Sequence, residues 1–478
     1  MSIDRKMMCA GIGLALLGPL AARAQEAEEL SRIRREIAEL KAAYESRIRA
    51  LESRLEAMQA GGRPAEAGAV ASTGAPAAAG APARTARVPA PGMPAPVARG
   101  PAVGSGLFNP EVSLILSGLY TRTSRDPSTY SITGFPVPPG TEIGPGERGP
   151  SLAESELALT ANIDPYLRGA MRLAIGADDT VAVEEAFIQT TGLGNGLTVK
   201  AGRFFSGIGY LNELHRHTWD FVDAPLAYQA FLGSQYGDDG VQLKWIAPTD
   251  TFAEFGFEVA RGRGTPGSGP RGNGAGAAAA YLHLGGDVGD SHSWRAGVSL
   301  LQASPRGQQA VGTDAEGRET DSTFSGRQRL WIGDFVWKWA PNGNPARVNF
   351  KLQGEIVRRQ QTGELLAAGS DADAPAGYRA SQWGGYLQAV WQFMPRWRVG
   401  LRTERLDPGR AWSDGVAIAA PGGDYAPTRN SLMVDFSPSE YSRFRVQLAR
   451  DNARAGAPDH QLFLQYQTSL GAHGAHRF

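Results

Sequence analysis

Two histidines separated by a single residue, His215 and His217, form the clearest metal-binding pattern in the chain. They lie in the segment NELHRHTWDF, close to the acids Glu213, Asp220 and Asp223. Imidazole and carboxylate groups are suitable ligands for a divalent metal such as zinc. This spacing is not specific for metal binding. The alternative is therefore that the histidines hydrogen-bond the backbone of their own loop. We therefore expect no resident cofactor, and zinc is the one candidate ion.

Basic residues recur at alternating positions in three later segments and supply charges that could oppose these acids. Apolar residues alternate with them, so the charges lie on one face of a strand. The candidate pore constriction combines Glu213, Asp220 and Asp223 with a basic ladder of Arg347, Lys351, Arg398, Arg402, Arg443 and Arg445. An acidic loop facing this ladder would create a transverse field that sets ion selectivity. The alternative is that these charges pair among themselves.

Alternation of apolar and polar residues continues from about Glu111 to the end of the chain and predicts the elements that hold these charges. Candidate strands begin near residues 111, 151, 166, 180, 196, 239, 251, 278, 291, 326, 346, 381, 396, 429, 441 and 460. About sixteen antiparallel strands, an even number, predict an all-β transmembrane barrel with polar residues inside. Short turns alternate with long loops, which places both chain ends on the periplasmic side.

The loop 206–238 after the fifth predicted strand is the expected constriction element. It is long and carries the aromatic residues Tyr210, Trp219, Phe221, Tyr228, Phe231 and Tyr236. Such a composition favours folding into the lumen over exposure to solvent. The other long loops are predicted at 122–150, 262–277, 303–324, 359–380 and 407–427.

The first part of the chain divides into segments of different composition. Residues 1–24 combine Arg5 and Lys6 with an apolar run and small residues, which predicts a signal peptide. Residues 25–60 carry a heptad pattern with a mixed Ile/Leu core, which predicts a periplasmic coiled coil larger than a dimer. Residues 61–105 are rich in Ala, Pro and Gly and predict a disordered linker, and 106–478 are assigned to the barrel.

This organisation predicts an outer-membrane protein of a Gram-negative bacterium with a periplasmic N-terminus. The expected partners are outer-membrane lipid, two further copies in a homotrimer, and the barrel assembly machinery, which would recognise the terminal Phe478. Contact with peptidoglycan through the stalk or linker is a further candidate. The chain has 48 basic and 48 acidic residues, and nucleic acid is not an expected partner.

A polar lumen of this width predicts a porin, a passive diffusion channel for small hydrophilic or charged solutes. Two alternatives stay open, a metal-linked outer-membrane transporter or receptor and an outer-membrane barrel enzyme. The sequence has no G-x-S-x-G elbow, and its single cysteine, Cys9, lies in the predicted signal peptide. We therefore expect no enzymatic activity.

Residues 183–233, VEEAFIQTTGLGNGLTVKAGRFFSGIGYLNELHRHTWDFVDAPLAYQAFLG, resemble a family of proteobacterial outer-membrane proteins. Its members are often labelled porins or zinc-regulated TonB-dependent receptors, and segments 108–120 and 469–478 are similar to the family too. A coiled coil before a barrel also resembles trimeric phosphate-selective porins. The resemblance implies a porin-type barrel. A TonB-dependent receptor would have a larger, plugged barrel of 22 strands, and the segments before this barrel do not resemble a plug.

Overall fold

The computed structural model describes residues 110–153, 155–177, 180–267, 274–367 and 374–471. The predicted signal peptide, coiled coil and linker lie outside the described residues, as does Phe478. Within the described residues, no helix combines the length and the apolar character needed to cross a bilayer.

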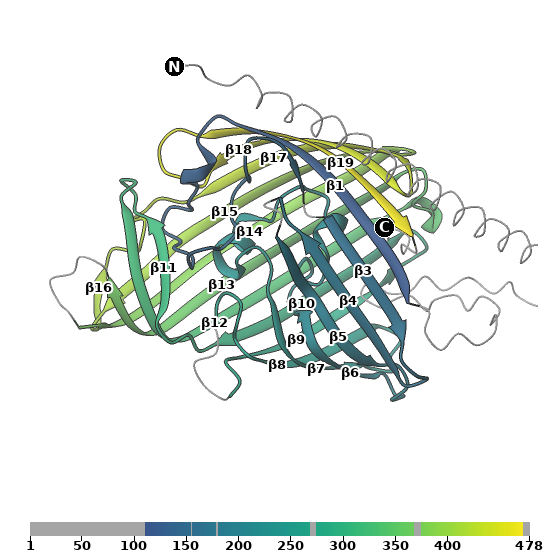
Figure 1. The fold of residues 1–478 in the computed structure, drawn as a ribbon, viewed down its shortest axis with the longest axis horizontal. Coiled ribbons are helices and arrows are strands. Elements are labelled where there is room, and N and C mark those ends of the chain that lie inside the picture. The colour runs from purple at the N-terminus through teal and green to yellow at the C-terminus, as the bar shows by residue number, and fades with distance from the viewer. Residues whose placement is uncertain (1–109, 154, 178–179, 268–273, 368–373, 472–478) are drawn as a thin grey trace, which may run out of the picture. The chain divides into compact units, whose positions relative to one another are not determined.

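The described chain forms a closed antiparallel β-barrel of sixteen strands (Figure 1). Consecutive strands of the ring pair with each other, and β1 pairs with β19 to close it. The ring strands are β1 (Glu111–Thr123), β3 (Ser155–Asn162), β4 (Leu167–Ile175), β5 (Val181–Thr190), β6 (Leu197–Phe205), β7 (Gly237–Ile246), β8 (Phe252–Ala260), β9 (Ala277–Val288), β10 (His292–Ala303), β12 (Glu319–Trp339), β13 (Asn349–Ala367), β14 (Ala376–Met394), β15 (Trp397–Ser413), β17 (Thr428–Ser439), β18 (Ser442–Asn452) and β19 (Asp459–Gly471). The predicted barrel is confirmed.

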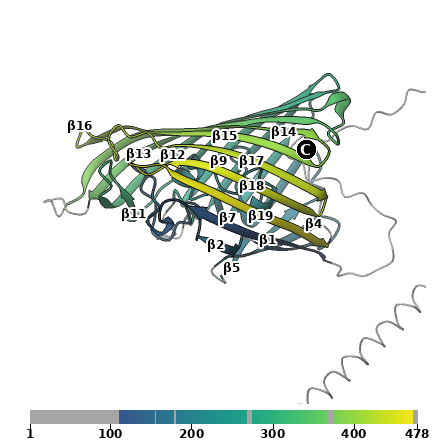
Figure 2. The same ribbon diagram turned by 90° about the horizontal axis from the view of Figure 1, so that it is seen from above.

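Three short strands extend the sheet without adding to the ring. They are β2 (Gly149–Leu152), β11 (Gln308–Thr313) and β16 (Val416–Ile418). Each pairs with one ring strand, namely β1, β12 and β15 respectively. β11 and β16 lie at the end of the barrel opposite to the start of β1 (Figures 1 and 2). The long loops therefore leave the barrel at one end, and the described chain ends lie at the other.

Strands β12 to β15 are longer than the sequence predicts and enter three of the predicted loops. For example, β13 continues to Ala367, although the pattern predicts a loop from residue 359. Beyond the exposed Ile356, the outward positions become polar, beginning with Arg358. Backbone pairing with β12 and β14 continues past this point, because ladder hydrogen bonds do not require apolar side chains.

The two faces of the barrel have opposite polarity, as predicted. On β13, Gln353 and Glu355 point inward and are 1% and 4% exposed, whereas Ile356 points outward and is 56% exposed. The outward apolar belt continues through Leu387, Leu401, Phe444 and Leu448. A polar interior and an apolar exterior are the reverse of a water-soluble barrel.

The packed core lies inside the lumen. Its largest contributor is the loop between β6 and β7, residues 206–236, which we call the constriction loop after the role that the sequence predicts for it. It contains the 3-10 helix η2 (Arg216–Thr218) and the helix α2 (Leu226–Leu232), and every residue of α2 is buried. The other 3-10 helices are η1 (Pro127–Thr129) and η3 (Pro341–Gly343).

Candidate functional site

The constriction loop turns into the lumen immediately after β6, and carboxylates on the barrel wall hold its backbone. Glu258 on β8 accepts a hydrogen bond of 2.9 Å from the backbone N–H of Gly207. Glu355 on β13 accepts hydrogen bonds from the N–H groups of Tyr210 and Leu211, at 3.2 and 3.0 Å. These carboxylates satisfy donors that would otherwise be buried without partners, so they fix the path of the loop.

Close approach of the backbone to the wall explains the glycine at position 209. Gly209 has φ of +65°, in the left-handed region. A Cβ atom at this position would lie 2.3 Å from a carboxylate oxygen of Glu355. Glycine therefore satisfies both the backbone conformation and the lack of space at this position.

Apolar contacts anchor the second half of the loop. Leu226, Tyr228 and Phe231 are 0% exposed and belong to one cluster with wall residues such as Ile332 and Leu406. The loop between β1 and β2 joins this cluster, because the ring of Phe135 packs edge-on against Phe231 with centroids 5.7 Å apart. The structure therefore places the aromatic loop inside the lumen, where the sequence predicts it.

Two of the three predicted acids contact the predicted basic ladder directly. Asp220 lies 2.5 Å from Lys351 and 3.2 Å from Arg398. Asp223 lies 2.6 Å from Arg402. The loop acids and the wall bases therefore form direct ion pairs, which is the alternative arrangement, and not a field across an open gap.

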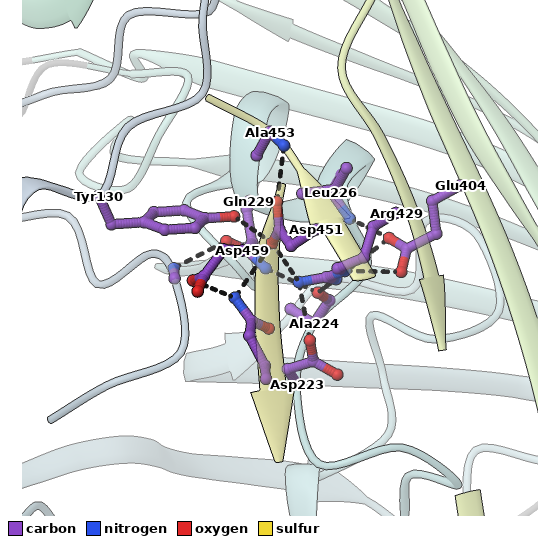
Figure 3. Close-up of polar contacts among 12 residues, drawn as sticks. Tyr130, Asp223, Ala224, Leu226, Gln229, Glu404, Arg429, Asp451, Ala453 and Asp459 are labelled. Carbon is purple, nitrogen blue, oxygen red and sulfur yellow. Dashed lines mark hydrogen bonds and ion pairs between the residues drawn. The ribbon is translucent and has the colours of Figure 1, made fainter. Parts of the chain in front are cut away.

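Arg429 on β17 is a central residue of this wall that is absent from the predicted ladder. Its guanidinium is 1% exposed and lies 2.7 Å from Asp223 and 2.8 Å from Glu404 (Figure 3). It also donates to the carbonyl oxygen of Ala224 at 2.6 Å. Glu404 in turn accepts the backbone N–H of Leu226 at 2.5 Å. Arg429 follows the same inward parity as its neighbours on the strand, which is the signal that could have found it.

The remaining predicted ladder residues have different environments. Arg445 lies 3.2 Å from Asp435, an inward acid that is absent from the predicted site. Arg443 donates to the backbone carbonyl of His217 at 2.8 Å. Arg347 is exposed in the turn between β12 and β13 and takes no place in the ladder. The sequence predicts Arg347 on a strand that begins near residue 346, but β13 begins only at Asn349.

Glu213 contacts the opposite wall and not the basic ladder. Its carboxylate lies 2.8 Å from Lys244 on β7. The predicted grouping of Glu213 with Asp220 and Asp223 is therefore wrong, because these acids point to different walls from one loop. The wall formed by β3 to β8 is rich in inward acids, namely Glu156, Glu184, Glu185, Glu254 and Glu258.

The predicted histidines face this acidic wall. His215 Nδ1 lies 3.1 Å from Glu156 and 3.5 Å from Glu184, and His215 Nε2 lies 3.0 Å from Glu185. His217 Nδ1 lies 3.2 Å from Glu156. The structure brings both histidines to carboxylates, but these come from β3 and β5 instead of from the loop.

Burial and ion pairing shift the pKa values of loop side chains in opposite directions. Burial alone would raise the pKa of Asp223, but attraction to Arg429 and Arg402 outweighs it and lowers the pKa to about 2. For Glu213, attraction to Lys244 likewise outweighs burial and lowers the pKa to about 2. Burial would lower the pKa of His215, but the three glutamates hold it well above its usual value. The constriction loop is therefore charge-complementary to both walls.

Comparison with known proteins gives the following likenesses. No protein-family model matches the chain. A protein of Aquifex aeolicus (strain VF5), described as uncharacterized, is 28% identical over 395 residues, which span 78% of this chain and 80% of that protein.

Several solved outer-membrane proteins are similar in structure. The trimer form of OmpT of Vibrio cholerae has a TM-score of 0.46 at 10% identity, covering 76% of this chain and 99% of that chain. The outer-membrane channel DcaP of Acinetobacter baumannii also has a TM-score of 0.46 at 10% identity, covering 76% and 97%. The anion-selective porin from Comamonas acidovorans has a TM-score of 0.44 at 13% identity, covering 76% and 99%.

Proposed function

We propose that the protein is an outer-membrane porin, a passive channel for small hydrophilic or charged solutes, narrowed by the constriction loop. The observation that carries this proposal is a polar barrel interior in which a buried loop is ion-paired to the wall. In particular, Asp220 and Asp223 bind the basic side of the lumen, and His215 binds the acidic side. Solutes would pass beside this loop.

The outward apolar belt supports a membrane location. Leu401 and Leu387 are 61% and 51% exposed, which would be unfavourable in water but suits contact with lipid. A charge facing lipid at mid-bilayer costs about 2–4 kcal/mol, so the charged face belongs inside the barrel. We place the short turns and both chain ends in the periplasm, since bacterial barrels have short periplasmic turns and long external loops.

The charge distribution supports a role in selecting ions. The basic residues Lys351 and Arg398 keep 17% and 25% of their side-chain surface exposed, while their partner Asp220 is 4% exposed. On the other wall, Arg172 is 27% exposed beside the buried Glu156. Solutes that pass the loop would therefore meet exposed cationic groups on the basic wall and at Arg172, and we propose a preference for anions.

Assembly is part of the same proposal. The heptad pattern in residues 25–60 supports a trimer held by a periplasmic stalk. We also propose that the predicted stalk or the predicted linker contacts peptidoglycan.

Single-channel recording in planar lipid bilayers tests the channel proposal. The parent should give discrete current steps, and a variant whose constriction loop is replaced by a short Gly/Ser turn should give larger steps, because the lumen would then narrow only at the wall. Shortening the turn at 314–317, between β11 and β12, provides a control that leaves the constriction loop in place. Absence of current in both parent and loop-deleted protein would overturn the proposal.

A further inference from the structure

A β-bulge on β5 brings two consecutive glutamates into the lumen. The pairing of β4 with β5 shifts between Arg172 and Leu173, so that Arg172 pairs with Glu185 and Leu173 pairs with Val183. Glu184 is the extra residue at this shift. Alternation would otherwise send one of two neighbouring side chains outward, but both reach His215. Bulges that redirect side chains are common beside functional sites.

Three atoms that could act as metal ligands meet at this bulge, and none of them has a hydrogen bond of good geometry. They are Oε2 of Glu156, Oε2 of Glu184 and Nδ1 of His215. All three lie within 4.8 Å of one another. Glu156 is only 4% exposed, and its Oε2 lacks a hydrogen bond of good geometry although Nδ1 of His215 and Nδ1 of His217 lie 3.1 and 3.2 Å away. Buried polar groups with poorly directed hydrogen bonds are costly, and a bound cation would satisfy them better.

The spacing of these donors fits a small divalent cation. His215 Nδ1 lies 3.1 Å from Glu156 Oε2 and 3.5 Å from Glu184 Oε2. Ligands bound at about 2.0–2.1 Å in a tetrahedral zinc site lie roughly 3.3 Å from each other. An ion of this kind would satisfy all three donors at once.

The other nitrogen of the same ring has the support that metal-bound histidines usually have. His215 Nε2 lies 3.0 Å from Glu185 Oε2. Glu185 is held by an ion pair with Arg172 and by the backbone N–H of Phe205, which donates to it at 3.1 Å. A carboxylate that binds the second nitrogen fixes the orientation of the ring and directs the first nitrogen to the metal.

We propose that Glu156, Glu184 and His215 form a site for a divalent cation of the zinc class, with Glu185 as the positioning residue. The ion would join the constriction loop to β3 and β5, so it would fasten the loop on the acidic wall. His217 lies 3.2 Å from the same Glu156 oxygen and is placed to complete the site. This inference depends on the loop lying in the lumen and does not require that the barrel conducts ions.

Metal binding by the untagged, detergent-folded, metal-stripped protein tests the site directly. Co²⁺ serves as the spectroscopic probe and Zn²⁺ as the calorimetric one. The parent should bind one ion per chain, with visible absorption bands from Co²⁺. Glu184→Gln and His215→Ala should weaken binding roughly tenfold or more, and Glu185→Gln should weaken it about 10–100-fold at unchanged stoichiometry.

Two controls separate this site from other histidines. His460→Ala changes an exposed histidine and should bind like the parent. A His473→Ala, His476→Ala double variant removes a histidine pair near the C-terminus and should also bind like the parent. Heat-modifiable migration on gels confirms that each variant is folded. Glu184→Gln keeps nearly the same side-chain shape, whereas His215→Ala removes the imidazole ring.

The proposal would be overturned if the parent bound neither ion, or if folded Glu184→Gln bound both as tightly as the parent. Loss of binding in the C-terminal double variant would also overturn it, because the ion would then bind elsewhere. These outcomes are measured as the affinity for Co²⁺ and Zn²⁺. They do not depend on whether the parent conducts current.

Discussion

The carboxylate of Asp223 lies 2.7 Å from the guanidinium of Arg429, and these side chains are 8% and 1% exposed. Asp223 belongs to the constriction loop and Arg429 to β17, so the contact joins the loop to the wall inside the barrel. Removing one partner of a buried ion pair costs about 3–5 kcal/mol, because the other charge stays buried. The loop is therefore fixed on the basic wall by electrostatic contacts as well as by the apolar packing of α2.

Neutralising the loop acids should change ion selectivity. In a variant with Glu213→Gln, Asp220→Asn and Asp223→Asn, Lys244 and the basic wall would keep their charges while the loop lost these three acids. The reversal potential in a salt gradient should then shift towards that of anions, because cationic groups dominate the field in the lumen. Chemical denaturation should also show a loss of stability of about 3 kcal/mol or more, from the unpaired wall charges.

Glu316→Gln is the matched control for this variant, since Glu316 is an exposed acid between β11 and β12. It should leave the reversal potential unchanged. An unaltered reversal potential in the folded triple variant would contradict the position of the loop in the ion path.

Strong acid should release the loop from the basic wall. The pKa of Asp223 is lowered from 3.8 to about 2, so its ion pairs contribute their full stability above the ordinary value and lose it as the pH falls through the lowered one. Single-channel conductance should therefore stay steady from neutral pH down to about pH 4 and rise, with more noise, as the pH approaches 2.

Asp223→Asn tests this origin of the acid response. It removes the titrating group, so its conductance at neutral pH should already resemble that of the parent in acid. A parent whose conductance changes between pH 7 and 5 would show that a different group controls the loop.

The sequence predicts the barrel well because alternation is a property of each strand by itself. The predicted starts near 166, 180 and 196 lie next to the observed starts of β4, β5 and β6. Strand ends are harder to predict at the long-loop end. There, outward residues such as Arg358 are polar, and the contrast between the two faces disappears while the backbone ladder continues.

The candidate site is predicted only in part, because it depends on which wall each loop residue reaches. Alternation identifies Lys351 and Arg398 as inward, but it cannot show that Glu213 turns to Lys244 while Asp220 turns to the basic ladder. The glutamates at the bulge were missed for a related reason. Two acids in succession, Glu184 and Glu185, break the alternation, and that break was the available signal.

The predicted stalk should determine the oligomeric state. Replacing Ile37 and Leu40 with Asp would place charges in the core of the coiled coil, where they cannot be solvated. The parent should have the mass of a trimer in mild detergent by light scattering, and the variant should dissociate more readily on dilution. Exchange of the exposed Glu316 for Gln should have no effect on the mass. A monomeric parent would refute the stalk as a trimerisation element.

Zinc should reduce the current through the parent channel if the proposed cation site fastens the constriction loop. Micromolar zinc would bind His215 together with carboxylates of β3 and β5, which holds the loop against the acidic wall and adds positive charge beside the path. A His215→Ala, His217→Ala double variant should keep its full current in zinc, and His460→Ala should be inhibited like the parent. Inhibition that persists in the double variant would mean that zinc acts at another position in the lumen. Binding of Co²⁺ without any change in current would keep the metal site but show that the loop is already immobile without the ion.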